Sequence, residues 1–165
     1  MEPMSFDEAI TLLKWEDSYS RLGAVMQIKG CMIPDVWLQV LGKEWSGCDN
    51  IAQYHPKLKR ALGTTGPLLQ MMSTEEQEVF NSLPDTVTVY RGCGSVNRKG
   101  CSWSLDREIA TSFPTFSRYK VDDPMLIKGV VKKNKILAVK LCREEQEVIS
   151  FNVKEVEVIP LNHST

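Results

Sequence analysis

The sequence changes character at Pro84, and this change limits the folds that the chain can adopt. Before it, apolar residues recur at helical spacing, as Phe6, Ile10 and Leu13 do. After it, short runs of β-branched residues alternate with turns, beginning with residues 86–90 (TVTVY). Helices followed by closely spaced strands predict an α+β fold whose sheet is mainly antiparallel.

The helices expected in the first part are recognised from residue types that favour helix ends. A serine three residues before a glutamate is a capping box, proline suits a first helical turn, and glycine or proline follows a last turn. These signals predict four helices. The first begins at Ser5 with Glu8, and the second runs from Pro34 to a stop at Gly42. The third covers residues 57–62, and the fourth begins at Ser73 with Glu76 and ends at Pro84.

The second part predicts a helix capped by Asp106 and several strands besides residues 86–90. The further strands are expected around Trp103 and over residues 127–131, 136–141, 148–153 and 156–159. Of the 165 residues 42% are hydrophobic, which is enough for a core without cross-links. We therefore expect a helical segment over residues 1–84, packed on a core over residues 85–165 within one compact domain.

The charge and hydropathy of the chain argue against two classes of partner. A formal net charge of −1 gives no overall positive field that would attract nucleic acid. No stretch approaches the roughly 18 apolar residues of a membrane span, and the N-terminus lacks the features of a signal peptide. The sequence therefore predicts a soluble, cytoplasmic protein for which neither a membrane nor a nucleic acid is indicated as a partner.

Metal ligation is not predicted either. The five cysteines include no pair with the CxxC spacing, and the two histidines, His55 and His163, lie far apart without flanking ligands. We expect no bound metal, and we expect the cysteines to be free thiols in a reducing compartment.

Three short features of the second part carry polar side chains that can share a site. Arg91 ends the first strand, Ser102 and Ser104 flank a tryptophan, and Glu145 and Glu147 lead into a late strand. Each feature alone is common in proteins that use it only structurally. In an extended segment, residues i and i+2 point to the same face, so the two serines project together, as do the two acids. An arginine at a strand end can bind a diphosphate with both arms of its guanidinium.

The pentapeptide EEQEV occurs twice, over residues 75–79 and 144–148. The first copy follows a helix cap, where the helix dipole favours acidic residues. The second copy leads directly into a β-branched strand. We therefore expect a structural role for Glu78 in the first copy and a chemical role for Glu147 at the same position of the second.

The order and spacing of the three features resemble those of the arginine–serine–glutamate class of mono-ADP-ribosyltransferases. That family carries an arginine on a first core strand, a Ser-Thr-Ser motif on a later strand and a Glu-x-Glu pair near the end. The resemblance covers roughly residues 86–160, with Trp103 in place of the threonine. It implies a compact split-sheet core, NAD as the substrate, nicotinamide as the leaving group and no metal.

The resemblance also implies a role for each residue. Arg91 would anchor the NAD phosphates, Ser102 would support the nicotinamide ribose and the carboxylate, and Ser104 would be a weaker supporting residue. Glu147 would be the catalytic carboxylate and would bind the 2′-hydroxyl of that ribose. Glu145 would orient or deprotonate the acceptor, and a glutamate here resembles enzymes that modify arginine.

Two further positions complete the expected NAD site. Gly92 would allow a ligand to approach the backbone closely, because glycine has no side chain to obstruct it. Phe113 or Phe116 would form an aromatic wall for nicotinamide.

The four tryptophans are expected to be structural where their context is readable. Trp15 and Trp37 lie on amphipathic helical patterns and should be in the core. Trp103 should pack behind the two serines. Trp45 precedes a loop, and its context fits either a core or a surface position.

The chemistry of NAD cleavage agrees with this arrangement. Nicotinamide leaves as a neutral molecule, so no general acid is needed, and the ribose passes through an oxocarbenium-like species as in glycoside cleavage. One carboxylate can stabilise that charge, and a second can serve the acceptor as a base. The sequence therefore favours a mono-ADP-ribosyltransferase of an effector or toxin-like kind, which modifies a macromolecular acceptor, with a protein arginine preferred.

Other functions stay open at this point. In an NAD glycohydrolase, water replaces the acceptor. An interaction protein on the same fold would bind a partner or nucleotide without turnover, although the pair of Glu145 and Glu147 argues against it. In a regulatory protein unrelated to NAD, the motif would be coincidental. The enzyme hypothesis requires that Arg91, Ser102 and Glu147 converge on one cleft.

Overall fold

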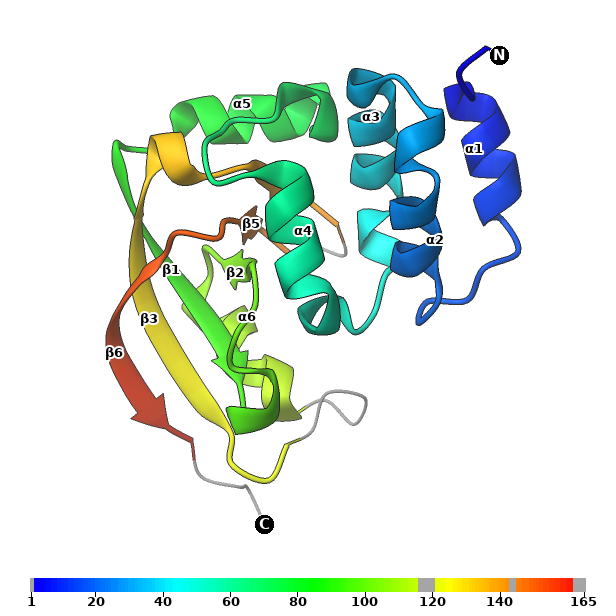
Figure 1. Cartoon of the computed structure of the whole chain (residues 1–165). Coiled ribbons are helices and arrows are strands. Elements are labelled where there is room, and N and C mark those ends of the chain that lie inside the picture. Colours follow the sequence, from blue (N-terminus) through cyan, green and yellow to red (C-terminus); the bar gives the residue numbers. More distant parts are fainter. Residues whose placement is uncertain (1, 116–120, 143–144, 162–165) are drawn as a thin grey trace.

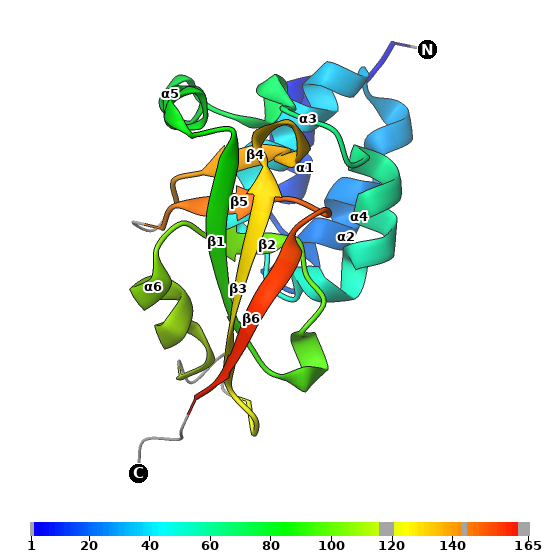
Figure 2. The same ribbon diagram turned by 90° about the vertical axis from the view of Figure 1, so that its left-hand side faces the viewer.

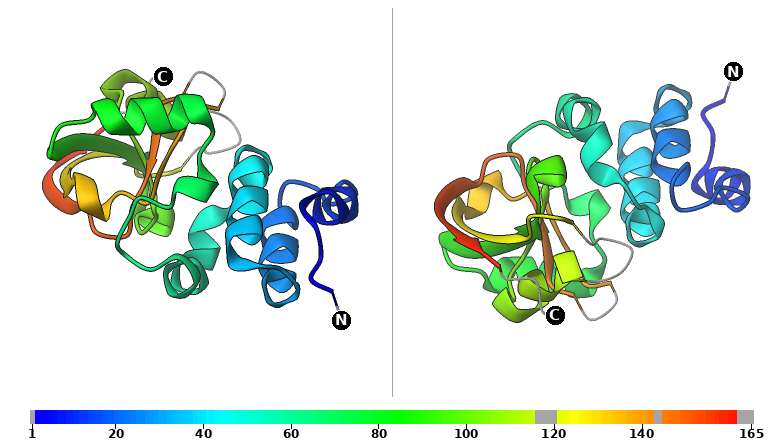
Figure 3. Two further views of the ribbon diagram at one scale, coloured as in Figure 1. Left: turned by 90° about the horizontal axis from the view of Figure 1, so that it is seen from above. Right: turned by 90° about the horizontal axis from the view of Figure 1, so that it is seen from below.

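The helices over residues 6–44 lie to one side of the sheet, whereas the later helices over residues 74–82 and 107–112 pack against strands (Figure 1). The computed structural model describes residues 2–115, 121–142 and 145–161. Seen from above and below, the first helices lie beside the sheet rather than on top of it (Figure 3). Within the described residues, the fold is therefore α+β, with six α-helices and a six-stranded antiparallel sheet.

The α-helices of the first part are joined by short turns and 3₁₀ segments. The helices are α1 (Phe6–Leu13), α2 (Arg21–Gln27), α3 (Pro34–Glu44), α4 (His55–Leu62), α5 (Thr74–Ser82) and, in the second part, α6 (Arg107–Ser112). The capping box at the start of α5 is complete, because the Ser73 hydroxyl accepts from the Glu76 amide (3.2 Å) and Glu76 accepts from the Ser73 amide (2.9 Å). At the start of α1, Ser5 accepts from the Glu8 amide (3.1 Å).

The predicted stop of the second helix at Gly42 is wrong, because α3 continues through this residue to Glu44. Gly42 is buried where α3 crosses the turn before α5, and a side chain there would collide with the carbonyl oxygen of Met71. The glycine thus permits a close approach of two backbone segments and does not end the helix. Helix α2 has no counterpart among the sequence-based predictions.

The sheet has the strand order β4-β5-β2-β1-β3-β6, and each neighbouring pair is antiparallel (Figure 2). The strands are β1 (Thr86–Cys93), β2 (Ser102–Ser104), β3 (Met125–Lys132), β4 (Ala138–Lys140), β5 (Glu147–Ile149) and β6 (Lys154–Pro160). Strands β4 and β5 have three residues each and are shorter than the expected segments 136–141 and 148–153.

The middle of the sheet is divided into two halves. Strand β1 pairs with β3 along its whole length, from Thr86 opposite Lys132 to Cys93 opposite Met125. On its other side β1 pairs with β2 at one position among the described residues, Tyr90 opposite Ser104. No other residues of the two strands are paired in the described part of the chain, and an opening lined by Arg91 and Gly92 of β1 and by Ser102 of β2 lies between them.

One apolar core extends from the first part of the chain into the sheet. Trp37 and Trp103 are buried in it, as predicted. The prediction for Trp15 is wrong, since its side chain is 84% exposed. Helix α1 ends at Leu13, so Trp15 lies past the apolar face of that helix, where the ammonium group of Lys14 is 5.6 Å from the centre of its ring.

A buried ion pair joins α5 to the sheet. Lys140 Nζ donates to Glu76 Oε1 and to the Met71 carbonyl, both at 2.9 Å, and the Leu141 amide donates to Glu76 Oε2 (2.8 Å). Burial raises the pKa of Glu76, but the amides of Ser73 and Leu141 and the Lys140 ammonium outweigh it, so the pKa lies below its usual value. Glu76, the second residue of the first EEQEV copy, therefore links the helical segment to β4.

Candidate functional site

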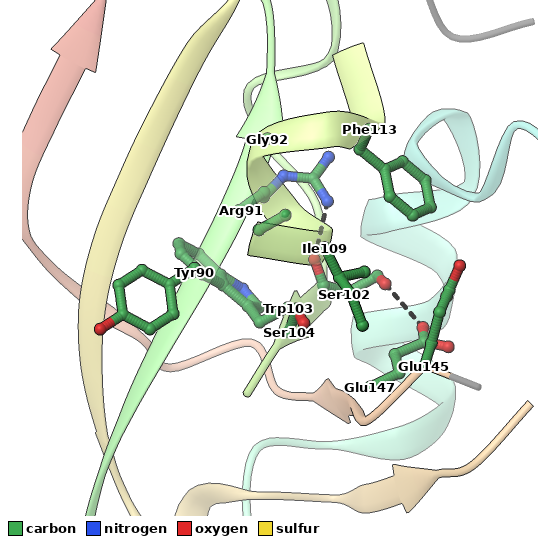
Figure 4. Close-up of a pocket in the computed structure, with 11 residues that line it drawn as sticks. Tyr90, Arg91, Gly92, Ser102, Trp103, Ser104, Ile109, Phe113, Glu145 and Glu147 are labelled. Carbon is green, nitrogen blue, oxygen red and sulfur yellow. Dashed lines mark hydrogen bonds between the residues drawn. The ribbon is translucent and has the colours of Figure 1, made fainter. Parts of the chain in front are cut away.

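The predicted site residues converge on a cleft at the opening between β1 and β2 (Figure 4). The cleft consists of two adjoining pockets. Six residues line both of them: Arg91, Gly92, Ser102, Phe113, Glu145 and Glu147. Ser104 lines the first pocket. The geometric condition set by the sequence is thus met, because the arginine, a serine and the acidic pair face one space.

Glu147 is half-buried and is the first residue of β5. Its Oε2 accepts two hydrogen bonds, from the Ser102 hydroxyl (2.6 Å) and from the indole Nε1 of Trp45 (2.8 Å). No hydrogen bond from the described residues reaches its Oε1. Burial raises the pKa of Glu147, and these two donors offset the effect in part. The carboxylate is thus fixed through one oxygen and has the other available for a ligand.

Glu145 lies beside Glu147 in the extended segment that leads into β5 (Figure 4). Gln146 between them is exposed, so the alternation of side chains expected for an extended segment is present. The charge of Glu145 adds to the elevation of the Glu147 pKa, although burial is the main cause. The cleft therefore holds two neighbouring carboxyl groups.

Ser102 and Ser104 share a face of β2, and Trp103 packs on the opposite face against Gly129. Only Ser102 contacts the carboxylate. The Ser104 hydroxyl instead donates to the Asp106 carbonyl and accepts from the Asp106 amide, both at 3.0 Å. The Ser104 hydroxyl therefore shapes the turn before α6, while the Ser104 backbone lies opposite Glu147 in the ladder between β2 and β5.

Arg91 spans the opening between the two strands. Its Nη1 donates to the Ser102 carbonyl (2.8 Å) and its Nη2 to the Asn97 carbonyl (2.7 Å). The guanidinium packs directly on Gly100, where a side chain would collide with it. Its Nε is buried without a hydrogen-bond partner in the described part of the chain, and burial lowers the pKa of the group. Arg91 thus holds β2 through one donor and the 3₁₀ turn at Asn97 through another, and these two bonds leave further N–H groups of its guanidinium unused.

Gly92 lines both pockets, and it also has a packing role that the sequence did not predict. A side chain at this position would collide with the Ala110 carbonyl oxygen and would lie 2.7 Å from Pro114 Cδ. The glycine thus lets α6 and the turn after it pack closely on β1. That packing places Phe113 at the side of the cleft, whereas Phe116 lies outside the described residues.

The helical segment supplies the opposite wall of the second pocket. The wall residues are Trp45, Ser46, Cys48, Asp49, Asn50, Ile51 and Ala52. Trp45 was not predicted to belong to the site, although its side chain is buried and bonds to Glu147. No sequence pattern marked it, because its partner lies 102 positions further along the chain.

The thiols near the cleft are not suited to nucleophilic catalysis. Burial raises the pKa of Cys48 to about 12 and also raises the pKa of Cys142, so both are protonated at neutral pH. All five cysteines are free thiols.

Within the described residues no group of three histidine, cysteine or acidic side chains could hold a metal ion. No helix in the described part of the chain is long and apolar enough to cross a membrane.

Comparison of the chain with protein-family models, curated proteins and solved structures gives no match.

Proposed function

We propose that this protein is a mono-ADP-ribosyltransferase on a compact split-sheet core. It would cleave NAD, release nicotinamide and transfer ADP-ribose to a macromolecular acceptor. One observation carries the proposal. Glu147 is held through Oε2 by two donors and keeps Oε1 available, in a cleft that it shares with Arg91 and Glu145.

The fixed carboxylate suits the bond that breaks. When the nicotinamide–ribose bond lengthens, positive charge develops on the ribose, and a preorganised anion nearby stabilises it. Oε1 of Glu147 would accept a hydrogen bond from the ribose 2′-hydroxyl. The positive nicotinamide ring of bound NAD would also lower the pKa of Glu147, which favours the ionised form that the reaction needs.

The other residues of the cleft fit the remaining parts of NAD. The unused donors of Arg91 would bind the diphosphate, and Arg91 also keeps Ser102 in place through the Ser102 carbonyl. Phe113 would lie against the nicotinamide ring.

Glu145 would serve the acceptor. Once nicotinamide has left, the acceptor nucleophile attacks the ribose C1′ and loses a proton, which Glu145 can take. A protein arginine is the preferred acceptor, because a guanidinium is attracted by Glu145 and Glu147 together.

The proposal is tested by incubating the purified protein with NAD labelled in the adenylate part, in the presence of lysate proteins or of polyarginine and polylysine. We expect nicotinamide release together with label on protein and on polyarginine. Glu147→Gln should lower the rate by about 100-fold or more, because it removes the main charge that stabilises the transition state. Glu78→Gln is the matched control. It makes the same change at the same position of the first EEQEV copy, on the exposed side of α5, and should leave activity unchanged.

Two other outcomes are informative. Nicotinamide release without label on any protein would show that the activity is that of an NAD glycohydrolase and not of a transferase. No nicotinamide release from a folded protein, at any acceptor concentration, would contradict the proposal and favour an interaction protein that binds without turnover.

A further inference from the structure

The contact between Trp45 and Glu147 connects the helical segment to the candidate catalytic carboxylate. Trp45 follows α3 as the first residue of the 3₁₀ turn Trp45–Gly47, and its side chain is 1% exposed. Its indole Nε1 lies 2.8 Å from Glu147 Oε2, the same oxygen that the Ser102 hydroxyl contacts. Two donors from opposite sides of the cleft therefore meet on one carboxylate oxygen.

We infer that Trp45 is a positioning residue for Glu147: its indole N–H fixes Oε2 as the anchored oxygen and thereby directs Oε1 to the ribose. This inference rests on the proposed function. The two donors differ in what they can fix. A serine hydroxyl can rotate and either donate or accept, so the Ser102 contact survives protonation of either oxygen. An indole N–H only donates, so it selects Oε2 as an acceptor and excludes a proton from it.

The indole is suited to this task because its surroundings hold it in place. Helix α3, which ends directly before Trp45, carries Trp37, whose indole donates to the Val25 carbonyl (2.9 Å). Glu44, the residue before Trp45, forms an ion pair with Arg21 (2.8 Å). A donor on a packed helix end keeps its geometry without losing side-chain freedom when substrate binds.

The charges around Glu147 come from several elements. Glu145 on the same segment raises its pKa, and Lys140 on β4 lowers it. Arg91 on β1 and the thiols of Cys101 and Cys142 also interact with it electrostatically. Asp49 lines the same cleft from the helical segment. Against this background, removal of the indole donor destabilises the anion and should raise the pKa of Glu147 further.

The contact can be tested without any activity. Four tryptophans give four indole N–H signals in an ¹⁵N NMR spectrum, and Trp45→Phe and Trp37→Phe assign two of them. We expect the Trp45 signal to shift with pH as Glu147 titrates, and we expect Glu147→Gln to remove this titration. The Trp37 signal, bonded to a backbone carbonyl, should not follow Glu147. A Trp45 signal that is indifferent to Glu147→Gln would overturn the inference.

Kinetics then separate positioning from plain packing. Trp45→Phe and Trp37→Phe make the same change in two buried side chains near opposite ends of α3, and each loses one indole hydrogen bond. For Trp45→Phe we expect kcat for nicotinamide release to fall about 10- to 100-fold, the range for a lost hydrogen bond to a charged group. We also expect KM to change little and the acid limb of the pH–rate profile to move to higher pH. Trp37→Phe should leave kcat, KM and the acid limb of the pH–rate profile unchanged.

The outcomes distinguish this inference from the proposed function. Equal losses in both variants, or an unmoved acid limb in Trp45→Phe, would make Trp45 a packing residue and refute the inference while the transferase stands. An inactive wild-type protein would refute the proposed function, and with it the role of Trp45 in positioning Glu147 for catalysis. The NMR titration would then still decide whether the indole fixes Oε2. If Trp45→Phe fails to fold, Trp15→Phe, Trp37→Phe and Trp103→Phe assign the Trp45 signal by elimination, and its response to Glu147→Gln gives the answer.

Discussion

Glu76→Gln should destabilise the protein far more than its conservative chemistry suggests. Glu76 and Lys140 form an ion pair whose side chains are only 8% and 5% exposed. The change keeps the shape of the side chain and removes its charge. Lys140 is then a buried cation whose remaining acceptors are the Met71 carbonyl and an amide oxygen.

The expected loss is about 3 kcal/mol. Breaking a buried pair by removing one partner costs roughly 3–5 kcal/mol, and we take the lower end because the glutamine oxygen can still accept from Lys140. A domain of this size has a total free energy of unfolding of about 5–15 kcal/mol. With a urea dependence of about 2 kcal/mol per molar, the unfolding midpoint should fall by ~1.5 M.

Urea unfolding followed by fluorescence measures this shift of the midpoint. Glu78→Gln, on the exposed face of the same helix, is the control. The sign of the pH dependence adds a second check. Because the pKa of Glu76 is lowered in the folded state, its contribution is present above the unfolded pKa of about 4.3 and is lost as the pH falls through the folded pKa. The gap between wild type and Glu76→Gln should therefore close in acid. If the two glutamine variants share one midpoint at neutral pH, the ion pair contributes nothing and the reasoning is wrong.

Two other substitutions should have opposite effects on stability. Burial raises the pKa of Glu147, so the stability that this shift contributes is full below about pH 4.3 and is lost as the pH rises through the folded pKa. Glu147→Gln should thus melt higher than wild type at neutral pH, by ~2–4 °C for each kcal/mol gained, with the gap closing in acid. Calorimetry that finds the variant less stable at neutral pH would contradict this. Gly92→Ala should lower stability by about 1–3 kcal/mol in urea unfolding, because the new methyl group overlaps the Ala110 carbonyl. Gly30→Ala, with no atom near the added group, should be nearly neutral, and equal losses in both variants would remove the steric explanation.

The parts of the fold and site that the sequence predicts correctly depend on neighbouring residues. Side chains two apart on a strand share a face, so Ser102 with Ser104, and Glu145 with Glu147, could be placed together before the structure was known. Local context also separated the two EEQEV copies. In the helical copy the buried acid is Glu76, at the second position of the pentapeptide. In the strand copy the acid that contacts Ser102 is Glu147, at the fourth position.

What the sequence could not predict depends on contacts between distant segments. Trp15 has the spacing of a core residue, but the helix ends before it and leaves it exposed. Gly42 has the composition of a helix stop, but the Met71 carbonyl lies against it. Trp45 gave no signal of its own, because its importance comes from an acid on the last part of the chain.

The Trp45–Glu147 hydrogen bond also bears on how this chain can be divided or recombined. Residues 85–165 contain the arginine, the serines and the acidic pair, and by motif alone they would be a transplantable catalytic unit. Grafted onto another helical partner, that unit would keep the Ser102 contact and lose the indole donor. Engineered chimaeras of this protein should therefore not be joined before β1, because Trp45 has to travel with Glu147. A junction before α3 would in turn break the Trp37–Val25 hydrogen bond and the Arg21–Glu44 ion pair, so the helical segment should be kept with the sheet as one unit.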